Sequence, residues 1–301
     1  MLRENEYAVC IKASVRANWS LDDAISRLDF DFTRRFLPPK IFGGEDLEFL
    51  SSDELLLLNH IRGFSYAHLF LFVEEYIILQ VVKQAGGHAQ EPDATQALQR
   101  FAEEEVKHQR LFRAMKDRLT AELGACGELS GMTDVANFIV SKPPLPVMLL
   151  TSLLEWITQR HYLECFKDNQ DLDPAFAEVF RLHWIEEAQH ARLDTLEIQG
   201  LCASASPAEL EAAFEVLIEL IAALDDLLKQ QVELDIDSLA AKRGRAFTED
   251  ERARLLADQH AAIRWTFITS GVEHRIFQRL VQDLSPTGAQ RLAEAAKQYA
   301  R

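Results

Sequence analysis

Two stretches of this chain place carboxylates in the middle of helices that are otherwise apolar. Residues 63–87 read GFSYAHLFLFVEEYIILQVVKQAGG, with Glu74 and Glu75 at the centre. Residues 147–166 read VMLLTSLLEWITQRHYLECF, with Glu155 at the centre. A helix that is apolar on every side is a buried helix. Because a buried carboxylate is costly without a compensating cation, both helices require a positive partner inside the fold.

Each apolar segment is followed by a helix that repeats one pattern of carboxylates and histidine. FAEEEVKHQRL (101–111) and HWIEEAQHARL (183–193) both contain Glu-x-x-His, and residues three apart in a helix share one face. Two such pairs, with one glutamate from each of two further helices, form the inward ligand set of a di-iron four-helix bundle. The repeat therefore predicts a dinuclear metal centre with the ligands Glu75, Glu105, His108, Glu155, Glu187 and His190.

Four glutamates of these segments have alternative roles: Glu74, Glu75, Glu104 and Glu186. Aligning VEEYI with LLEWI places Glu75 opposite Glu155, which favours Glu75 over Glu74 as the ligand of the first helix. Glu104 and Glu186 each lie four residues before a histidine of the pair and could accept that histidine's other ring N–H. A solvated helix face is equally compatible with these two positions.

The repeat is broken at one position. The second stretch begins with His183 where the first has Phe101. His183 lies four residues before Glu187 and seven before His190, so all three fall on one stripe of the helix. The segment reads His-x3-Glu-x2-His and predicts His183 as a third metal-binding histidine.

The rest of the chain indicates an all-α fold. Only 12 Gly and 9 Pro occur in 301 residues, and no strand-like alternation is long enough to predict a sheet. We expect a helix from about residue 52, followed by the apolar segment, and further helices over residues 93–123, 147–166, 173–200, 206–235 and 249–284, with a short helix at the C-terminus.

Charge and cysteine usage restrict partners and compartment. The net charge of −16 opposes binding to nucleic acid or to an anionic membrane surface. No uninterrupted apolar run reaches the ~20 residues that span a bilayer. Four scattered cysteines without a CxxC pair indicate reduced thiols. We therefore expect a cytoplasmic protein.

The ligand pattern resembles the p-aminobenzoate N-oxygenase (AurF-like) family, over about residues 63–200. The resemblance implies a ferritin-like four-helix bundle as one domain over residues 1–301, with accessory helices at the N-terminus and over residues 207–300. It also implies a di-iron centre that activates O₂ and oxygenates an amine, often an aryl amine, to a hydroxylamine or nitro product. A homodimer is implied as well, and no catalytic residue is predicted beyond the metal ligands.

Several alternatives share the basic ligand pattern. They are another ferritin-like di-iron oxidase or hydroxylase, a ferroxidase or iron-binding protein without oxygenase activity, and a non-enzymatic helical module. A tyrosyl-radical reductase subunit is disfavoured because Phe112 stands where its tyrosine is usual. Ligand types do not separate two irons from a mixed Mn/Fe pair.

The substrate and the electron donor are less constrained. No cofactor motif is visible, so we expect an external donor, a ferredoxin or a flavin reductase. Core packing is the favoured role of the candidate pocket aromatics, and solvated surface that of the later polar candidates. These candidates are Phe72, Phe101, Trp156 and Trp184, followed by His260, Arg264 and Glu273.

Overall fold

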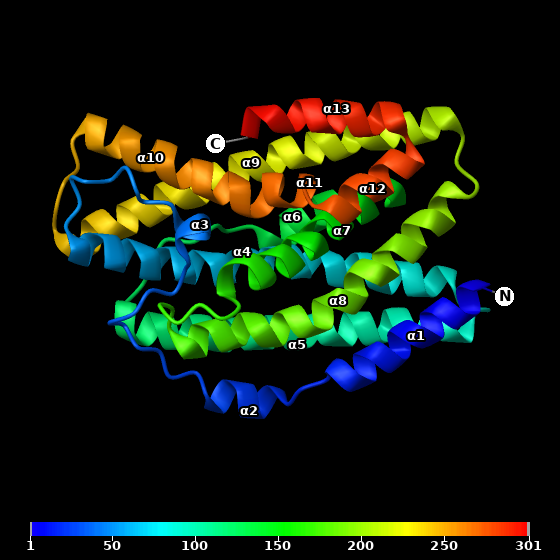
Figure 1. Ribbon diagram of the computed structural model, residues 1–301, viewed down its shortest axis with the longest axis horizontal. Coiled ribbons are helices and arrows are strands. Elements are labelled where there is room, and N and C mark those ends of the chain that lie inside the picture. The colour runs from blue at the N-terminus through cyan, green and yellow to red at the C-terminus, as the bar shows by residue number, and fades with distance from the viewer. Residues whose placement is uncertain (1, 300–301) are drawn as a thin grey trace.

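The computed structural model describes residues 2–299, and no strand occurs among them. Four helices form the central bundle: α4 (Ser52–Gly87), α5 (Pro92–Leu123), α7 (Pro144–His161) and α8 (Pro174–Cys202). Helix α4 packs along α5, α7 packs along α8, and α5 also contacts α8 (Figure 1). The all-α, ferritin-like fold is therefore confirmed, with each apolar helix beside the Glu-x-x-His helix that follows it.

Local signals in the sequence explain where the long helices begin. Ser51 caps α4 in a reciprocal capping box with Glu54, and α5, α7 and α8 have proline in their first turn. Within α4, Gly63 allows close packing, because a Cβ there would lie 3.0 Å from both Phe36 and Phe176 and would displace these rings by a few tenths of an ångström. Helix α4 is continuous through Gly63.

Accessory helices cover the bundle on two sides. Helices α1 (Leu2–Ala17) and α2 (Leu21–Ser26) lie against α5, and α1 also contacts α8. On the opposite side lie α9 (Pro207–Arg243), α10 (Glu249–Arg264) and α13 (Pro286–Ala296), of which α9 contacts α4 and α7 (Figure 1). Shorter helices complete the fold: α3 (Pro39–Phe42), α6 (Met132–Val140), α11 (Ser270–Val272) and α12 (Arg275–Leu284).

The predicted helix over residues 249–284 is wrong as a single element. Helix α10 passes into a π-helical turn, Trp265–Thr269, and then into α11. The chain breaks at His274, whose ψ of 124° is extended, before α12 begins. A second π-helical turn, Tyr162–Phe166, follows α7. π-Helical turns are uncommon in proteins, and many of those that do occur lie near functional sites.

Helix α4 is long and apolar enough, by length and composition, to span a membrane. In this fold, 72% of the qualifying window is buried inside the protein. A core helix of a four-helix bundle passes the same test, because it has to be apolar on nearly all sides. We therefore describe α4 as a core helix.

His161, the last residue of α7, is buried as a neutral ring. Tyr66 Oη donates to His161 Nδ1 over 2.8 Å, and Nε2 lies 3.1 Å from Ser270 Oγ. The Ser270 hydroxyl donates its own hydrogen to the Thr266 carbonyl, so it accepts from Nε2–H. Both ring nitrogens are thus satisfied without a positive charge. Burial lowers the pKa of His161 to about 3, with the nearby Arg160 and Lys40 acting in the same direction.

This histidine should make the protein sensitive to acid. Its folded-state pKa lies below the unfolded value, so the unfolded state binds the proton first as pH falls below about 6.5. The free energy of unfolding should therefore fall between about pH 6.5 and pH 3, by at most ~1.4 kcal/mol per pH unit from this group. Urea denaturation of metal-free wild type and His161→Gln at pH 7, 6 and 5 measures this, and parallel pH dependence of the two proteins would contradict it.

Candidate metal centre

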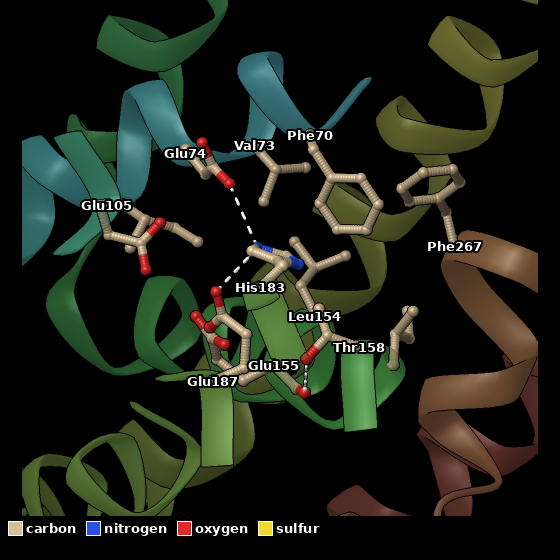
Figure 2. Close-up of a pocket in the computed structure, with 12 residues that line it drawn as sticks. Phe70, Val73, Glu74, Glu105, Leu154, Glu155, Thr158, His183, Glu187 and Phe267 are labelled. Atoms are coloured by element: carbon tan, nitrogen blue, oxygen red, sulfur yellow. Dashed lines mark hydrogen bonds and ion pairs between the residues drawn. The ribbon is translucent and has the colours of Figure 1, made fainter. Parts of the chain in front are cut away.

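Seven buried side chains of the four bundle helices meet at one place. They form two adjoining groups, Glu74, His108 and His183 in one, and Glu105, Glu155, Glu187 and His190 in the other. Within each group the ligand atoms lie within 4.8 Å of one another. Figure 2 shows Glu74 entering from α4 toward His183, with Glu105, Glu155 and Glu187 around them. The structure thus brings together every predicted ligand except Glu75.

Glu105 and Glu187 occupy bridging positions between the two groups. Glu187 places one oxygen 3.1 Å from His108 Nδ1 and the other 2.8 Å from His190 Nδ1. Glu105 is arranged in the same way, at 3.8 Å from His108 Nδ1 and 2.9 Å from His190 Nδ1. A carboxylate in this position can give one oxygen to each of two metal ions. Glu74 and Glu155 belong to one group each, where each would hold one of the two ions.

Unsatisfied polar atoms show that the site fits a pair of cations. Six buried atoms at the site make no hydrogen bond: Glu74 Oε1 and Oε2, Glu105 Oε1, His108 Nδ1, Glu155 Oε2 and Glu187 Oε1. His108 Nδ1 and Glu187 Oε1 approach to 3.1 Å and still lack hydrogen-bond geometry. Two ligands of one ion, each bonded at roughly 2.1 Å, come this close to each other. Carboxylate and imidazole donors of this kind suit iron and manganese.

The structure does not bring Glu75 together with the other predicted ligands. Glu75 is only partly buried and accepts a hydrogen bond of 3.0 Å from Gln109 Nε2, away from the other ligands. The adjacent Glu74 is 2% exposed and lies 3.3 Å from His183 Nε2. Adjacent residues of a helix differ by about 100° in direction, so Glu74 faces the centre while Glu75 faces Gln109.

The break in the repeat has a structural explanation. The Phe101 ring stacks on His190, with centroids 3.8 Å apart, whereas the His183 ring packs edge-on against His108 at 4.6 Å. Each side chain therefore lies beside the histidine of the opposite half. His183 Nε2 lies 2.7 Å from Glu187 and 3.3 Å from Glu74, so it faces one half of the centre only.

Glu104 and Glu186 hold the far sides of the two histidines, but with crossed pairing. His108 Nε2 lies 2.9 Å from Glu186 of α8, and His190 Nε2 lies 2.9 Å from Glu104 of α5. The sequence suggested a carboxylate one turn earlier in the same helix, and this pairing is wrong. The bonds leave Nδ1 of both rings free to face the centre. Ser14 of α1 and Gln189 also donate to Glu104.

Removing one of these supporting carboxylates should weaken metal binding without abolishing it. Glu186→Gln keeps the volume but replaces a charged acceptor of the His108 N–H by a neutral amide. Loss of such a partner typically costs 10–100-fold in metal affinity or activity, as an order of magnitude. Competition with a chelator measures the affinity, with Glu178→Gln on the surface of the same helix as the matched control. Equal affinity in both variants would contradict the supporting role.

Burial dominates the electrostatics of the ligands. Without a cation, burial raises the pKa of Glu74 to about 8, partly offset by the neighbouring His183 ring. Burial also raises the pKa of Glu155 well above its usual range, and the neighbouring Glu187 charge adds to this. The pKa of His190 is raised despite burial, because Glu187, Glu104 and Glu105 surround it. A cation pair would let all of these carboxylates ionise together.

Most of the predicted pocket candidates serve packing or surface contacts. Trp156 stacks on His274 and Trp184 on Tyr162. His260 and Arg264 both bind Asp225, and Glu273 pairs with Arg160. Of the seven candidates, Phe72 lines a cavity beside the metal centre.

Sequence reasoning missed Asp194. It is 0% exposed, both its oxygens lack hydrogen-bond partners, and burial raises its pKa well above the usual range. Its position one turn after His190 was the available signal, because this face of α8 points inward.

The arrangement of paired Glu-x-x-His helices around two bridging carboxylates defines a ferritin-like di-metal carboxylate protein. Comparison with protein families narrows this class. The chain matches the model of the p-aminobenzoate N-oxygenase AurF over residues 14–285 and belongs to that family. The protein is accordingly a di-iron oxygenase that uses O₂.

Solved structures give more distant similarities. Two mutants of an R2-like ligand-binding oxidase with an anaerobically reconstituted Mn/Fe cofactor are 15% and 16% identical to the chain, each with a TM-score of 0.41. Both alignments cover 85% of this chain, and they cover 90% and 92% of the oxidase chains. A search of curated proteins finds no match.

Proposed function

We propose that this protein transfers oxygen from O₂ to the nitrogen of a small-molecule amine, giving a hydroxylamine or nitro product. The observation that carries the proposal is the third histidine. His183 completes the His-x3-Glu-x2-His segment in this member of the AurF family. Its Nε2 lies 3.3 Å from Glu74 and 2.7 Å from Glu187, close enough for all three side chains to hold one ion. This histidine distinguishes the site from the basic six-ligand pattern of ferritin-like iron oxidases.

The chain's own residues prepare the site for this reaction. Two iron ions, when bound, supply the activation of O₂. Glu104 and Glu186 fix the orientation of the histidine rings, which keeps the ligand atoms in place for the ions. Phe70, Val73, Leu154 and Phe267 form an apolar wall next to His183 (Figure 2). This wall excludes water from the place where the substrate nitrogen would be oxidised.

Product analysis tests the proposal. The apoprotein is loaded anaerobically with ferrous iron, reduced, and exposed to ¹⁸O₂ with a panel of aryl and alkyl amines. Mass spectrometry should find label on nitrogen. Label on carbon alone would indicate a hydroxylase of the same fold, and iron accumulation without a labelled product would indicate a ferroxidase.

A substitution of His183 tests its place in the centre. His183→Phe copies the residue of the first half of the repeat and should lower the occupancy or affinity of one metal more than the other, because His183 faces one half of the centre only. Metal analysis and Mössbauer spectroscopy of the ⁵⁷Fe-loaded protein measure this. His260→Ala, which removes a ring bound to Asp225, is the control. Two unchanged iron signals would remove His183 from the ligand set.

Three further properties are part of the proposal. A homodimer, an external donor such as a ferredoxin or flavin reductase, and a cytoplasmic location accord with the family and with the composition of the chain. Light scattering on a size-exclusion column tests the dimer. An assembly of 12 or 24 chains that accumulates excess iron would instead favour storage, as in ferritins.

A further inference from the structure

A cavity adjoins the metal centre on the side of the accessory helix α9. It has a volume of about 430 Å³, within the usual range of ligand sites. Val73, Leu154 and Phe267 line both this cavity and the metal centre, so they form the boundary between the two. Figure 2 shows Val73 and Leu154 beside His183, with Phe267 farther away on the other side of Phe70. We call this cavity the chamber.

The chamber has a buried inner end and an exposed rim. Leu69, Phe72 and Tyr76 of α4 line the inner part and are buried. Phe138 of α6 and Asp226 of α9 lie on the rim and are exposed. The exposed end of the chamber is thus lined by α6 and α9, and its inner side is lined by the residues that it shares with the metal centre. The position of Phe267 at this boundary places one of the two π-helical turns next to the proposed site of reaction.

The charged groups of the chamber are acidic. Asp134 and Asp226 are its charged lining residues, and none of the described lining residues is Lys or Arg. Lys142 approaches the rim, where its ammonium lies 4.2 Å from the centre of the Phe138 ring, but it does not itself line the chamber. An ionised carboxylate brought into such a space would lose its hydration without gaining an ionic partner.

We infer that the chamber is the substrate site and that it takes an aryl amine with an apolar substituent and no carboxylate. The inference rests on the proposed function, which places the amine nitrogen at the boundary with the metal centre. Aromatic walls from Phe72, Tyr76 and Phe138 suit an aryl ring. The family to which the chain belongs is named for p-aminobenzoate. The carboxylate of that compound would find no Lys or Arg partner among the residues that line the chamber.

A matched pair of probes isolates the effect of the carboxylate. Methyl 4-aminobenzoate and 4-aminobenzoate share the aryl amine and differ in negative charge. Calorimetric titration of the anaerobic, iron-loaded protein should show at least about tenfold tighter binding of the ester. Equal or tighter binding of the acid would overturn the inference.

Two substitutions test whether the probes bind in the chamber. Leu224→Trp fills it from α9 and should weaken ester binding at least about tenfold, whereas Leu163→Trp, at an exposed position outside it, should not. Asp226→Arg supplies a cation at the exposed rim and should shrink the preference for the ester severalfold, which keeps the test valid if Leu224→Trp fails to fold. Unchanged ester binding in a folded Leu224→Trp protein, or an unchanged preference in Asp226→Arg, would place the probe elsewhere.

The binding experiment tests the substrate site, and the product experiment tests the proposed reaction, so either proposal can be refuted without the other. Selective, chamber-dependent binding of the ester without nitrogen oxygenation would support the substrate site and remove the proposed reaction. Nitrogen oxygenation with a preference for the acid would keep the reaction and overturn the proposed substrate class.

Discussion

Glu187→Ala should lose both metal binding and oxygenation. Glu187 lies 2.7 Å from His183, 2.8 Å from His190 and 3.1 Å from His108, so it contacts all three histidines of the centre. No other carboxylate in the described site approaches all three of them this closely. Its loss removes a bridging ligand and should lower oxygenation by at least about 100-fold, more than the loss of a partner that only supports a ligand. Metal analysis should find fewer than the roughly two ions per chain of a di-iron site.

A surface glutamate of the same helix provides the control for this result. Glu178 pairs with Arg181 on the exposed side of α8, and Glu178→Ala should retain its metals and activity. Circular dichroism before loading separates loss of ligand from loss of fold. Full metal content in a folded Glu187→Ala protein would refute the bridging position.

The adjacent glutamates of α4 should behave in opposite ways. Glu74→Gln should abolish binding of at least one metal, because Glu74 faces His183 in the core, whereas Glu75→Gln should leave the metal content unchanged. Both substitutions keep side-chain volume and remove one charge. The metal-induced rise in melting temperature should therefore shrink in Glu74→Gln and persist in Glu75→Gln. The reverse pattern would restore Glu75 as the ligand.

The metal-free proteins provide a second measurement of the same position. Burial raises the folded-state pKa of Glu74 to about 8, far above the unfolded value near 4.3. Between these two pH values the folded state keeps the proton on Glu74, whereas the unfolded state has released it. Stability contributed by this group is therefore lost as pH rises from about 4.5 to 8. Metal-free Glu74→Gln has no carboxyl group to titrate at this position. Its free energy of unfolding, measured by urea denaturation, should therefore rise relative to that of wild type from pH 5 to pH 8. Parallel curves would contradict the buried position of Glu74.

The sequence predicts much of this architecture because the chemistry repeats. A carboxylate within an apolar helix and a Glu-x-x-His pair on the next helix are each visible from spacing alone, and together they specified Glu105, His108, Glu155, Glu187 and His190 at one place. The repeat therefore indicated both the bundle and its centre. The choice between Glu74 and Glu75 is not fixed by the sequence, because VEEYI offers two glutamates and periodicity alone does not decide which one faces inward.

Features that depend on contacts between distant segments were not predictable. The crossed pairing of Glu104 and Glu186 requires the distance between α5 and α8, which spacing within one helix does not contain. The break at His274 follows a π-helical turn, and the residues around it look helical by composition. The chamber is assembled from α4, α6, α7, α9 and the turn containing Phe267, so its acidic, base-free lining is visible only in three dimensions.

The crossed hydrogen bonds make the two halves of the repeat mutually dependent. Each half carries a histidine whose ring is oriented by a glutamate of the other half. A half expressed alone would contain its own Glu-x-x-His pair and still leave the histidine unanchored. If the protein arose by duplication of a helical hairpin, the ancestral hairpin had to pair with a second copy of itself to bind metal in this way. The present chain would then be a fused dimer whose two former subunits can no longer be separated.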